Sequence, residues 1–189
     1  MKRFLLIFIS CLMVFSLCAC DSSDPAVAGE GQKLAGRDAG NKAVQYSFAY
    51  PEEWELFRND GVVEIQYDCN ESDAVAEYAT ITVLGFTLSN SDQTAKEYWK
   101  EQKPEAESVF TDFKELDIEE YDTAEKYLDD APAMKVKYSG KMNDRTYISD
   151  QIICCRLGEV YLVTLVVPEE YYDSVSSALI AVKDSFKFA

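Results

Sequence analysis

Apolar and polar residues alternate over several short stretches in the first half of the chain, and this alternation predicts β-strands. Val44–Tyr50 is the first such stretch, and a proline ends it. Trp54–Phe57 and Val62–Tyr67 flank residues 58–61, whose Asn, Asp and Gly tolerate positive φ and predict a hairpin turn. Tyr78–Phe86 alternates in the same way, so the pattern predicts a strand, a hairpin and a further strand in this region.

The second half of the chain predicts three strands joined by short turns. Met134–Tyr138 buries one face and solvates the other, and turn residues separate it from Thr146–Leu157. A second turn at 157–159 leads into Val160–Val167. Strands connected so closely pair as an antiparallel meander.

Two of these strands are apolar at consecutive positions and therefore on both faces. Ile152–Cys155 and Val160–Val163 show this pattern. Central strands buried on both sides need a layer above and a layer below the sheet. We therefore predict an α+β fold, an antiparallel β-sheet with helices packed on both faces (an α/β/α sandwich).

Helical periodicity predicts two helices as those layers. The first begins at caps among Asn90–Asp92, has Ala95, Tyr98 and Trp99 on one side, and is predicted to end before Pro104. Residues 105–130 are acidic and their pattern does not decide between element types. Phe113–Tyr121 is the stretch within them that favours a strand.

The second predicted helix follows Pro168 and closes the chain. Glu169 and Glu170 lie in its first turn, where the helix dipole favours negative charge. Its predicted buried face is Val175, Ala178, Leu179 and Val182. Phe186 and Phe188 are predicted to form an extended packing tail.

The N-terminus predicts export. Lys2 and Arg3 precede Phe4–Leu17, 14 uncharged and mostly apolar residues. A membrane-spanning helix needs about 20 such residues, so this segment is typical of a secretory signal peptide. We predict a signal peptide at 1–19, a flexible tether rich in Ser, Asp, Gly, Ala and Pro at 20–43, and a globular domain at 44–189.

The end of that signal, Leu17-Cys18-Ala19-Cys20, resembles the lipobox of bacterial lipoproteins. The resemblance implies that the thiol of Cys20 receives a diacylglycerol and that cleavage leaves Cys20 as the first residue. Several acyl chains on one residue would hold the protein to a membrane. The alternative is a plain secretory signal in which Cys20 has no such role.

Charge and composition exclude several classes of function. Removing residues 1–19 takes away two basic residues and no acid, leaving 16 basic against 34 acidic residues, a net charge of −18. This field disfavours nucleic acids and anionic lipid surfaces as partners. The chain has no histidine, which excludes Ser–His and Cys–His pairs and histidine-based zinc sites. We therefore predict no catalytic residue, no cofactor and no metal site.

Two carboxylate motifs and three thiols are the remaining candidates for a metal, catalytic or disulfide site. Asp68–Asp73 begins like a calcium loop but lacks the turn Gly and the bidentate Glu, so an ordinary hairpin loop is favoured. Carboxylates are abundant in this chain, so the acid group at 117–122 is better explained as a solvated strand or loop than as a hydrolytic pair. Cys69 can bridge to Cys154 or to Cys155, or all three thiols are free; both alternatives stay open. The acid group comprises Asp117, Glu119, Glu120 and Asp122.

The two ends of the globular part resemble PsbP-like (Mog1/PsbP) domains. The opening Tyr46–Trp54 has their aromatic–small–aromatic–Pro–x–x–Trp pattern before a hairpin, and the close at Asp184–Phe188 is similar to their C-terminal end. The resemblance covers 44–188 in element order and implies the layered fold predicted above. It implies no single activity, because members assist photosystem assembly, bind small GTPases or are uncharacterised. It carries over no functional residue, and Trp54 is expected to be a core or hairpin anchor.

These observations lead to a hypothesis about function. The chain is expected to be a non-catalytic, lipid-anchored binding or assembly-assisting lipoprotein on the extracytoplasmic face of the cell membrane. The membrane, through the lipid on Cys20, and a cell-envelope protein are the expected partners. Two alternatives are a carboxylate-dependent extracytoplasmic hydrolase and a lipoprotein that binds a small apolar or sugar ligand between sheet and helix.

Overall fold

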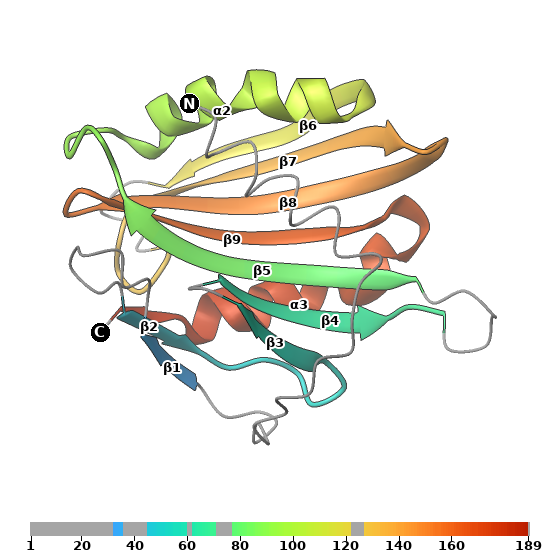
Figure 1. Ribbon diagram of the computed structural model, residues 1–189, viewed down its shortest axis with the longest axis horizontal. Helices are drawn as coiled ribbons and strands as arrows, with labels where there is room; N and C mark the ends of the chain where they lie inside the picture. The colour runs from blue at the N-terminus through green and yellow to red at the C-terminus, as the bar shows by residue number, and fades with distance from the viewer. Residues whose placement is uncertain (1–31, 36–44, 60–61, 71–76, 122–126, 189) are drawn as a thin grey trace.

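The structure, a computed structural model, describes residues 32–35, 45–59, 62–70, 77–121 and 127–188 (Figure 1). The predicted signal peptide and Cys20 lie outside the described residues. Of the predicted tether, the described part is strand β1 (Gln32–Ala35), whose backbone pairs with β2 (Gln45–Phe48). Among the described residues, no helix has the length and apolar character needed to cross a membrane.

A seven-stranded antiparallel sheet forms the body of the domain, in the order β3-β4-β5-β9-β8-β7-β6 (Figure 1). The predicted meander is its β7-β8-β9 portion, and β9 joins this meander to β5. A smaller sheet has the order β1-β2-β10. The strands of the large sheet are β3 (Glu55–Asn59), β4 (Val62–Asp68), β5 (Tyr78–Thr87), β6 (Thr111–Tyr121), β7 (Ala133–Met142), β8 (Arg145–Arg156) and β9 (Glu159–Pro168).

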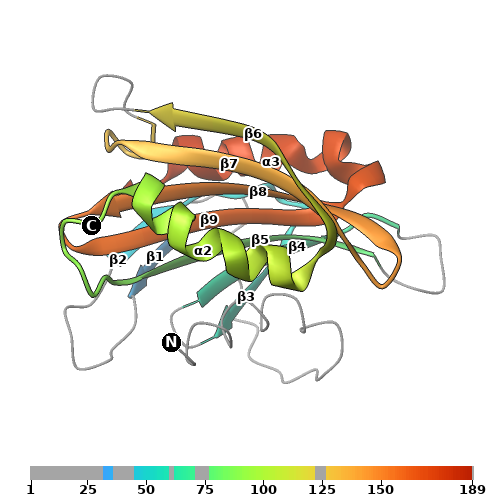
Figure 2. The same cartoon turned by 90° about the horizontal axis from the view of Figure 1, so that it is seen from above.

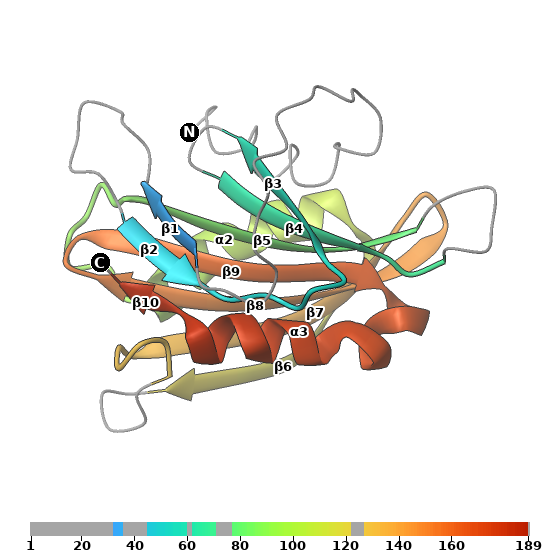
Figure 3. The same cartoon turned by 90° about the horizontal axis from the view of Figure 1, so that it is seen from below.

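Two helices cover opposite faces of this sheet, which confirms the predicted α+β layering. Helix α2 (Ala95–Val109) packs on β6, β7 and β8 (Figure 2). Helix α3 (Tyr172–Ser185) follows a short 3₁₀ turn, η2 (Glu169–Tyr171), and packs on the other face against β9 and β2 (Figure 3). The chain then ends in β10 (Lys187–Phe188), which pairs with β2.

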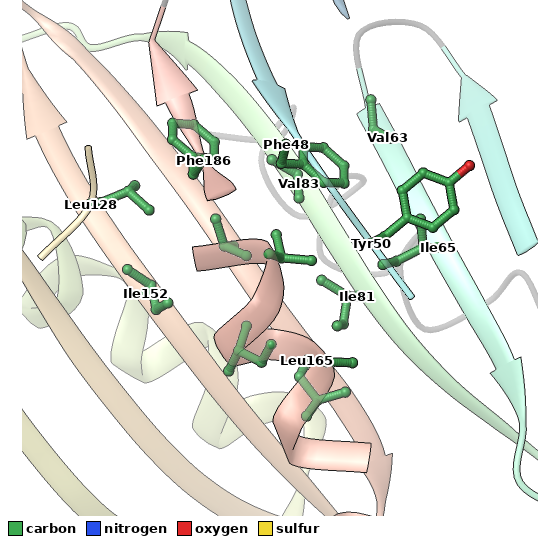
Figure 4. Packing of buried hydrophobic residues seen from close by; sticks show 14 of the residues in the cluster. Phe48, Tyr50, Val63, Ile65, Ile81, Val83, Leu128, Ile152, Leu165 and Phe186 are labelled. Atoms are coloured by element: carbon green, nitrogen blue, oxygen red, sulfur yellow. The ribbon is translucent and has the colours of Figure 1, made fainter. Parts of the chain in front are cut away.

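Apolar side chains fill the interface between α3 and the sheet (Figure 4). Ile81, Ile152 and Leu165 project from three adjacent central strands, and each is at most 1% exposed. The predicted buried face of α3 is confirmed, because Val175, Ala178, Leu179 and Val182 all lie in this core.

The predicted aromatic anchors are also confirmed. Trp54 is 5% exposed and its ring stacks on Tyr67 of β4 with 5.7 Å between ring centroids. Phe186 is fully buried beyond the end of α3, and its ring stacks on Tyr46 with centroids 5.6 Å apart. Phe188 meets Tyr161 edge-on at 4.7 Å. The extended tail therefore closes the α3 side of the core.

The boundaries predicted for α2 were wrong at both ends. Thr94 is the N-cap, in a capping box in which the Glu97 backbone N–H donates to Thr94 Oγ1 at 3.2 Å and the Thr94 N–H donates to Glu97 Oε2 at 3.0 Å. The helix continues through Pro104, which lies on its exposed side. Ala106 beyond the proline is fully buried, so packing on the sheet stabilises this part of the helix although proline cannot donate its backbone hydrogen bond.

The three described thiols are free. Of the two alternatives left open by the sequence, the structure has the unbridged one. Cys154 is fully buried on β8, and this burial raises the pKa of its thiol to about 12. A thiol so rarely ionised is a poor nucleophile.

An ion cluster ties the ends of three elements together. Arg145, at the start of β8, donates from both terminal nitrogens to the two carboxylate oxygens of Glu77, with Nη2 and Oε2 2.7 Å apart. The same Nη2 also donates to Glu170 in η2. The hydrogen-bonded guanidinium lowers the pKa of Glu77 below its usual range. This arrangement fastens the start of β5 to the β7–β8 turn and to η2.

Replacing Arg145 by Lys keeps the charge but loses the forked contact, so we expect the free energy of unfolding at neutral pH to fall by about 1 kcal/mol. The folded-state pKa of Glu77 is lowered from its ordinary value of 4.5. The stability that the Glu77–Arg145 contact contributes is therefore fully present above about pH 4.5, and it is lost as the pH falls through the folded-state pKa. Urea unfolding of both proteins from about pH 7 to about pH 2.5 should show the difference closing. A difference that stays constant down to the lowest pH would contradict this assignment.

Candidate functional site

The most unusual feature of the large sheet is a set of polar side chains on the α2 face of its central strands. Side chains alternate between faces along a strand, and the intervening residues of β4, β5, β8 and β9 lie on the α3 side, where all but Asp150 belong to the apolar core. Glu64 is opposite Thr82, Thr82 is opposite Thr164, and Thr164 is opposite Gln151. One pair further along, Gln66 is opposite Thr80. We call this set, with Ser149, the polar row: Glu64, Gln66, Thr80, Thr82, Ser149, Gln151 and Thr164.

The polar row is partly satisfied by bonds among its own members. Gln151 Nε2 donates to Thr164 Oγ1 at 2.8 Å, and Gln66 Nε2 donates to Glu64 Oε1. Ser149 is 1% exposed and its hydroxyl has no hydrogen-bond partner among the described residues. Buried hydroxyls in folded proteins nearly always have a partner, so Ser149 leaves a polar group that a further molecule could satisfy.

Burial sets the electrostatics of the row. Glu64 is 9% exposed, and its burial raises the pKa of its carboxyl above the usual range, although the hydrogen bond from Gln66 acts in the opposite direction. Thr82 and Gln151 are each 4% exposed, whereas Gln66, Thr80 and Thr164 are half-buried. In this partly dry setting a hydrogen bond to the row is stronger than it would be in water.

The surroundings of the row differ on its two sides. Leu84 and Leu162 lie on the same face one pair along the strands and belong to the apolar cluster under α2. On the other side, Tyr78 and Tyr147 are half-buried on the same face. In Figure 1, α2 lies along the β6 side of the sheet, and no described helix stands in front of β9, β5 and β4. The row is thus bordered by apolar side chains at one end and tyrosine rings at the other.

The structure does not bring the described members of the acid group together as one site. Asp117 and Glu119 on β6 are opposite Lys137 and Lys135, whereas Glu120 points to the other face and pairs with Lys96 Nζ at 2.7 Å. Asp122 lies outside the described residues. Alternation along the edge strand therefore divides this group between the two faces of the sheet.

The calcium-like motif is only partly described. Asp68 Oδ1 accepts hydrogen bonds from the backbone N–H groups of Asn70 at 2.9 Å and Glu77 at 3.3 Å, which closes the loop between β4 and β5. Residues 71–73 of the motif lie outside the described residues. Within the described ranges, no group of three or more acidic or cysteine side chains is placed to hold a metal ion.

A second polar cluster lies on the α3 face and fastens α3 to the sheet. Asp150 is 2% exposed; it accepts a hydrogen bond from the Tyr172 hydroxyl at 2.7 Å, and Lys135 Nζ is 3.7 Å away. Burial raises the pKa of Tyr172 far above its usual range, so the phenol keeps the proton that it donates. Lys137 Nζ lies 3.6 Å from the centroid of the Tyr172 ring. These contacts explain the cluster as a structural one.

Solved structures with the same fold include LpqN of Mycobacterium tuberculosis, which is involved in cell envelope biogenesis. That match has a TM-score of 0.63 at 13% identity and covers 84% of this chain and 91% of that one. Cyanobacterial PsbP (CyanoP) of Synechocystis sp. PCC 6803 matches with a TM-score of 0.53 at 18% identity, over 92% and 99% of the two chains. PA94 of Pseudomonas aeruginosa, a protein of unknown function, matches with a TM-score of 0.51 at 15% identity, over 78% and 91%.

These identities establish the fold alone. The fold is PsbP-like, as the sequence motifs at the two ends of the globular part predicted. No protein-family model matches the chain. A search of curated proteins also finds no match.

Proposed function

We propose that this chain is a non-catalytic binding protein of the cell envelope, held at the extracytoplasmic face of the membrane by lipid on Cys20. The observation that carries the binding role is the polar row, because four of its polar side chains are buried on inner strands of the sheet and the hydroxyl of one, Ser149, has no hydrogen-bond partner among the described residues. The N-terminal signal with its lipobox supports the location. The fold shared with LpqN, a protein involved in cell envelope biogenesis, is consistent with that setting.

The number and spacing of the carboxylates on this face favour binding over hydrolysis. The polar row contains one carboxyl, that of Glu64. Asp68, on the same face of β4, is four residues away, about 13 Å along an extended strand. Glycosidases hold their two carboxyl groups about 5–9.5 Å apart. With no histidine in the chain to serve as a base, the row is better suited to holding a ligand than to cleaving one.

The contacts on the α3 side also favour the α2 face of the sheet as the place of binding. The space between α3 and the sheet is occupied by the large apolar core (Figure 4). The polar row lies on the opposite face, beside α2. A ligand held between sheet and helix would therefore meet the row on the α2 side.

Proximity labelling tests the proposal as a whole. A full-length copy with a labelling enzyme after Ala189 should enrich a small, reproducible set of cell-envelope components. The matched control carries the same enzyme on an unrelated lipoprotein of the same membrane. A labelling profile identical to that control would contradict a binding role.

A further inference from the structure

The chemistry of the polar row identifies a class of ligand. It presents one carboxyl, two carboxamides and four hydroxyls from four adjacent strands of one sheet face. Amides and hydroxyls both donate and accept hydrogen bonds. A ligand that matches them needs closely spaced groups that can also do both, and the hydroxyls of a sugar have that property.

We propose that the polar row binds a neutral saccharide of the cell envelope. This inference rests on the proposed function and specifies its ligand. The net charge of −18 left after removal of residues 1–19, together with the Glu64 carboxyl in the row, disfavours anionic sugars. Tyr78 and Tyr147 border the row with rings that combine an apolar face and a polar edge, as is common where one side of a ligand is apolar and the other hydrated.

The unsatisfied hydroxyl of Ser149 also indicates a ligand. This hydroxyl is buried within the row and has no partner among the described residues. Leaving such a group unsatisfied costs about 1–3 kcal/mol. A ligand hydroxyl reaching this position would satisfy it, which makes the bound state more favourable than the empty one.

The stability of the sheet does not explain the polar row. β4, β5, β9 and β8 are inner strands of the sheet, and on their other face the residues that meet the core are apolar apart from Asp150 of β8. Functional sites are often kept at a cost in stability, and apolar replacements there stabilise the fold while removing function. A binding role and a stabilising role for the row therefore predict opposite effects of an apolar substitution on the stability of the fold.

The experiment uses the mature full-length chain in detergent micelles, titrated with two neutral probes, maltotriose and triacetylchitotriose, and one anionic probe, trigalacturonate. We expect saturable binding of at least one neutral probe by isothermal titration calorimetry, and no binding of trigalacturonate. The variant Q151L/T164V removes both partners of the hydrogen bond within the row, so that neither is left unsatisfied. It should weaken binding about tenfold or more, since two hydrogen-bonding groups are lost.

The matched control is T87V, which changes an exposed threonine on β5 outside the row. It should bind like the wild type. The melting temperature without sugar provides the second measurement, and for Q151L/T164V it should be equal to or above that of the wild type.

Three results would overturn the inference: no saturable binding of either neutral probe, unchanged affinity in Q151L/T164V, or a melting temperature of that variant several degrees below the wild type. The last result would assign the row to the stability of the sheet. Enrichment of envelope components by proximity labelling, combined with absent sugar binding, would remove this inference and leave the proposed function intact. Failure of both would remove both.

Discussion

Substitution of Phe186 by Ala should lower the free energy of unfolding by about 3–5 kcal/mol. The side chain is fully buried and contacts three aromatic rings, those of Tyr46, Tyr161 and Phe188, with centroids 5.1–6.3 Å away. Removing it leaves a cavity that these rigid rings cannot fill by small movements. A domain of this size is stable by about 5–15 kcal/mol, so the melting temperature should fall by about 10 °C.

The two tryptophans of the chain allow this effect to be located. Trp54 lies in the core under α3, and Trp99 lies in the cluster under α2. Urea unfolding followed by fluorescence should give the same reduced midpoint from either tryptophan in single-tryptophan forms, if the sheet unfolds cooperatively. Ile180→Ala is the control, because Ile180 is on α3 and 56% exposed, and it should cost less than about 1 kcal/mol. A Phe186→Ala protein as stable as this control would refute the role given to the C-terminal tail.

Loss of the Cys20 thiol should move the protein from the membrane fraction to the soluble fraction. The predicted anchor is the lipid itself, since each buried methylene contributes about 0.8 kcal/mol and two or more chains suffice for stable attachment. We expect Cys20→Ser, exported with an ordinary cleavable signal peptide, to raise the ratio of soluble to sedimenting protein by more than about tenfold. Carbonate-washed membranes analysed by immunoblot give this ratio.

The neighbouring thiol provides the matched control. Cys18 precedes the predicted cleavage site, so Cys18→Ser should be processed and should sediment like the unaltered protein. If the Cys20→Ser protein sedimented as completely as the wild type after equal processing, another membrane contact would have to hold it. Lipid anchoring would then be the wrong explanation of its location.

Much of the fold could be predicted because its signals are local. The hairpins at residues 142–145 and 156–159 are encoded by short turns between alternating strands, and the structure places β7, β8 and β9 as that pattern predicts. The buried face of α3 follows from helical spacing over a few turns. The end of α2 could not be predicted in this way, because burial of Ala106 against distant strands overrides the local effect of Pro104.

The polar row could not be predicted from the sequence alone. Three of the four strands have polar residues at alternate positions, as in Thr80 and Thr82, but such a pair on its own resembles an ordinary solvated face. The fourth strand, β9, contributes Thr164 alone. Their significance depends on β9 lying between β5 and β8, which brings Thr164 between Thr82 and Gln151. Pairing between strands so far apart in the sequence cannot be deduced from local patterns. The consecutive apolar residues of β8 and β9 instead predicted two apolar faces.

The proposed lipidation of Cys20, on which the proposed location depends, can be tested on the protein purified from its own membrane. Mass spectrometry of the N-terminal peptide should show Cys20 as the first residue, carrying the mass of a diacylglyceryl group with or without an additional acyl chain. An unmodified N-terminus, or one that begins at any other residue, would contradict the anchor and the extracytoplasmic binding role inferred from it.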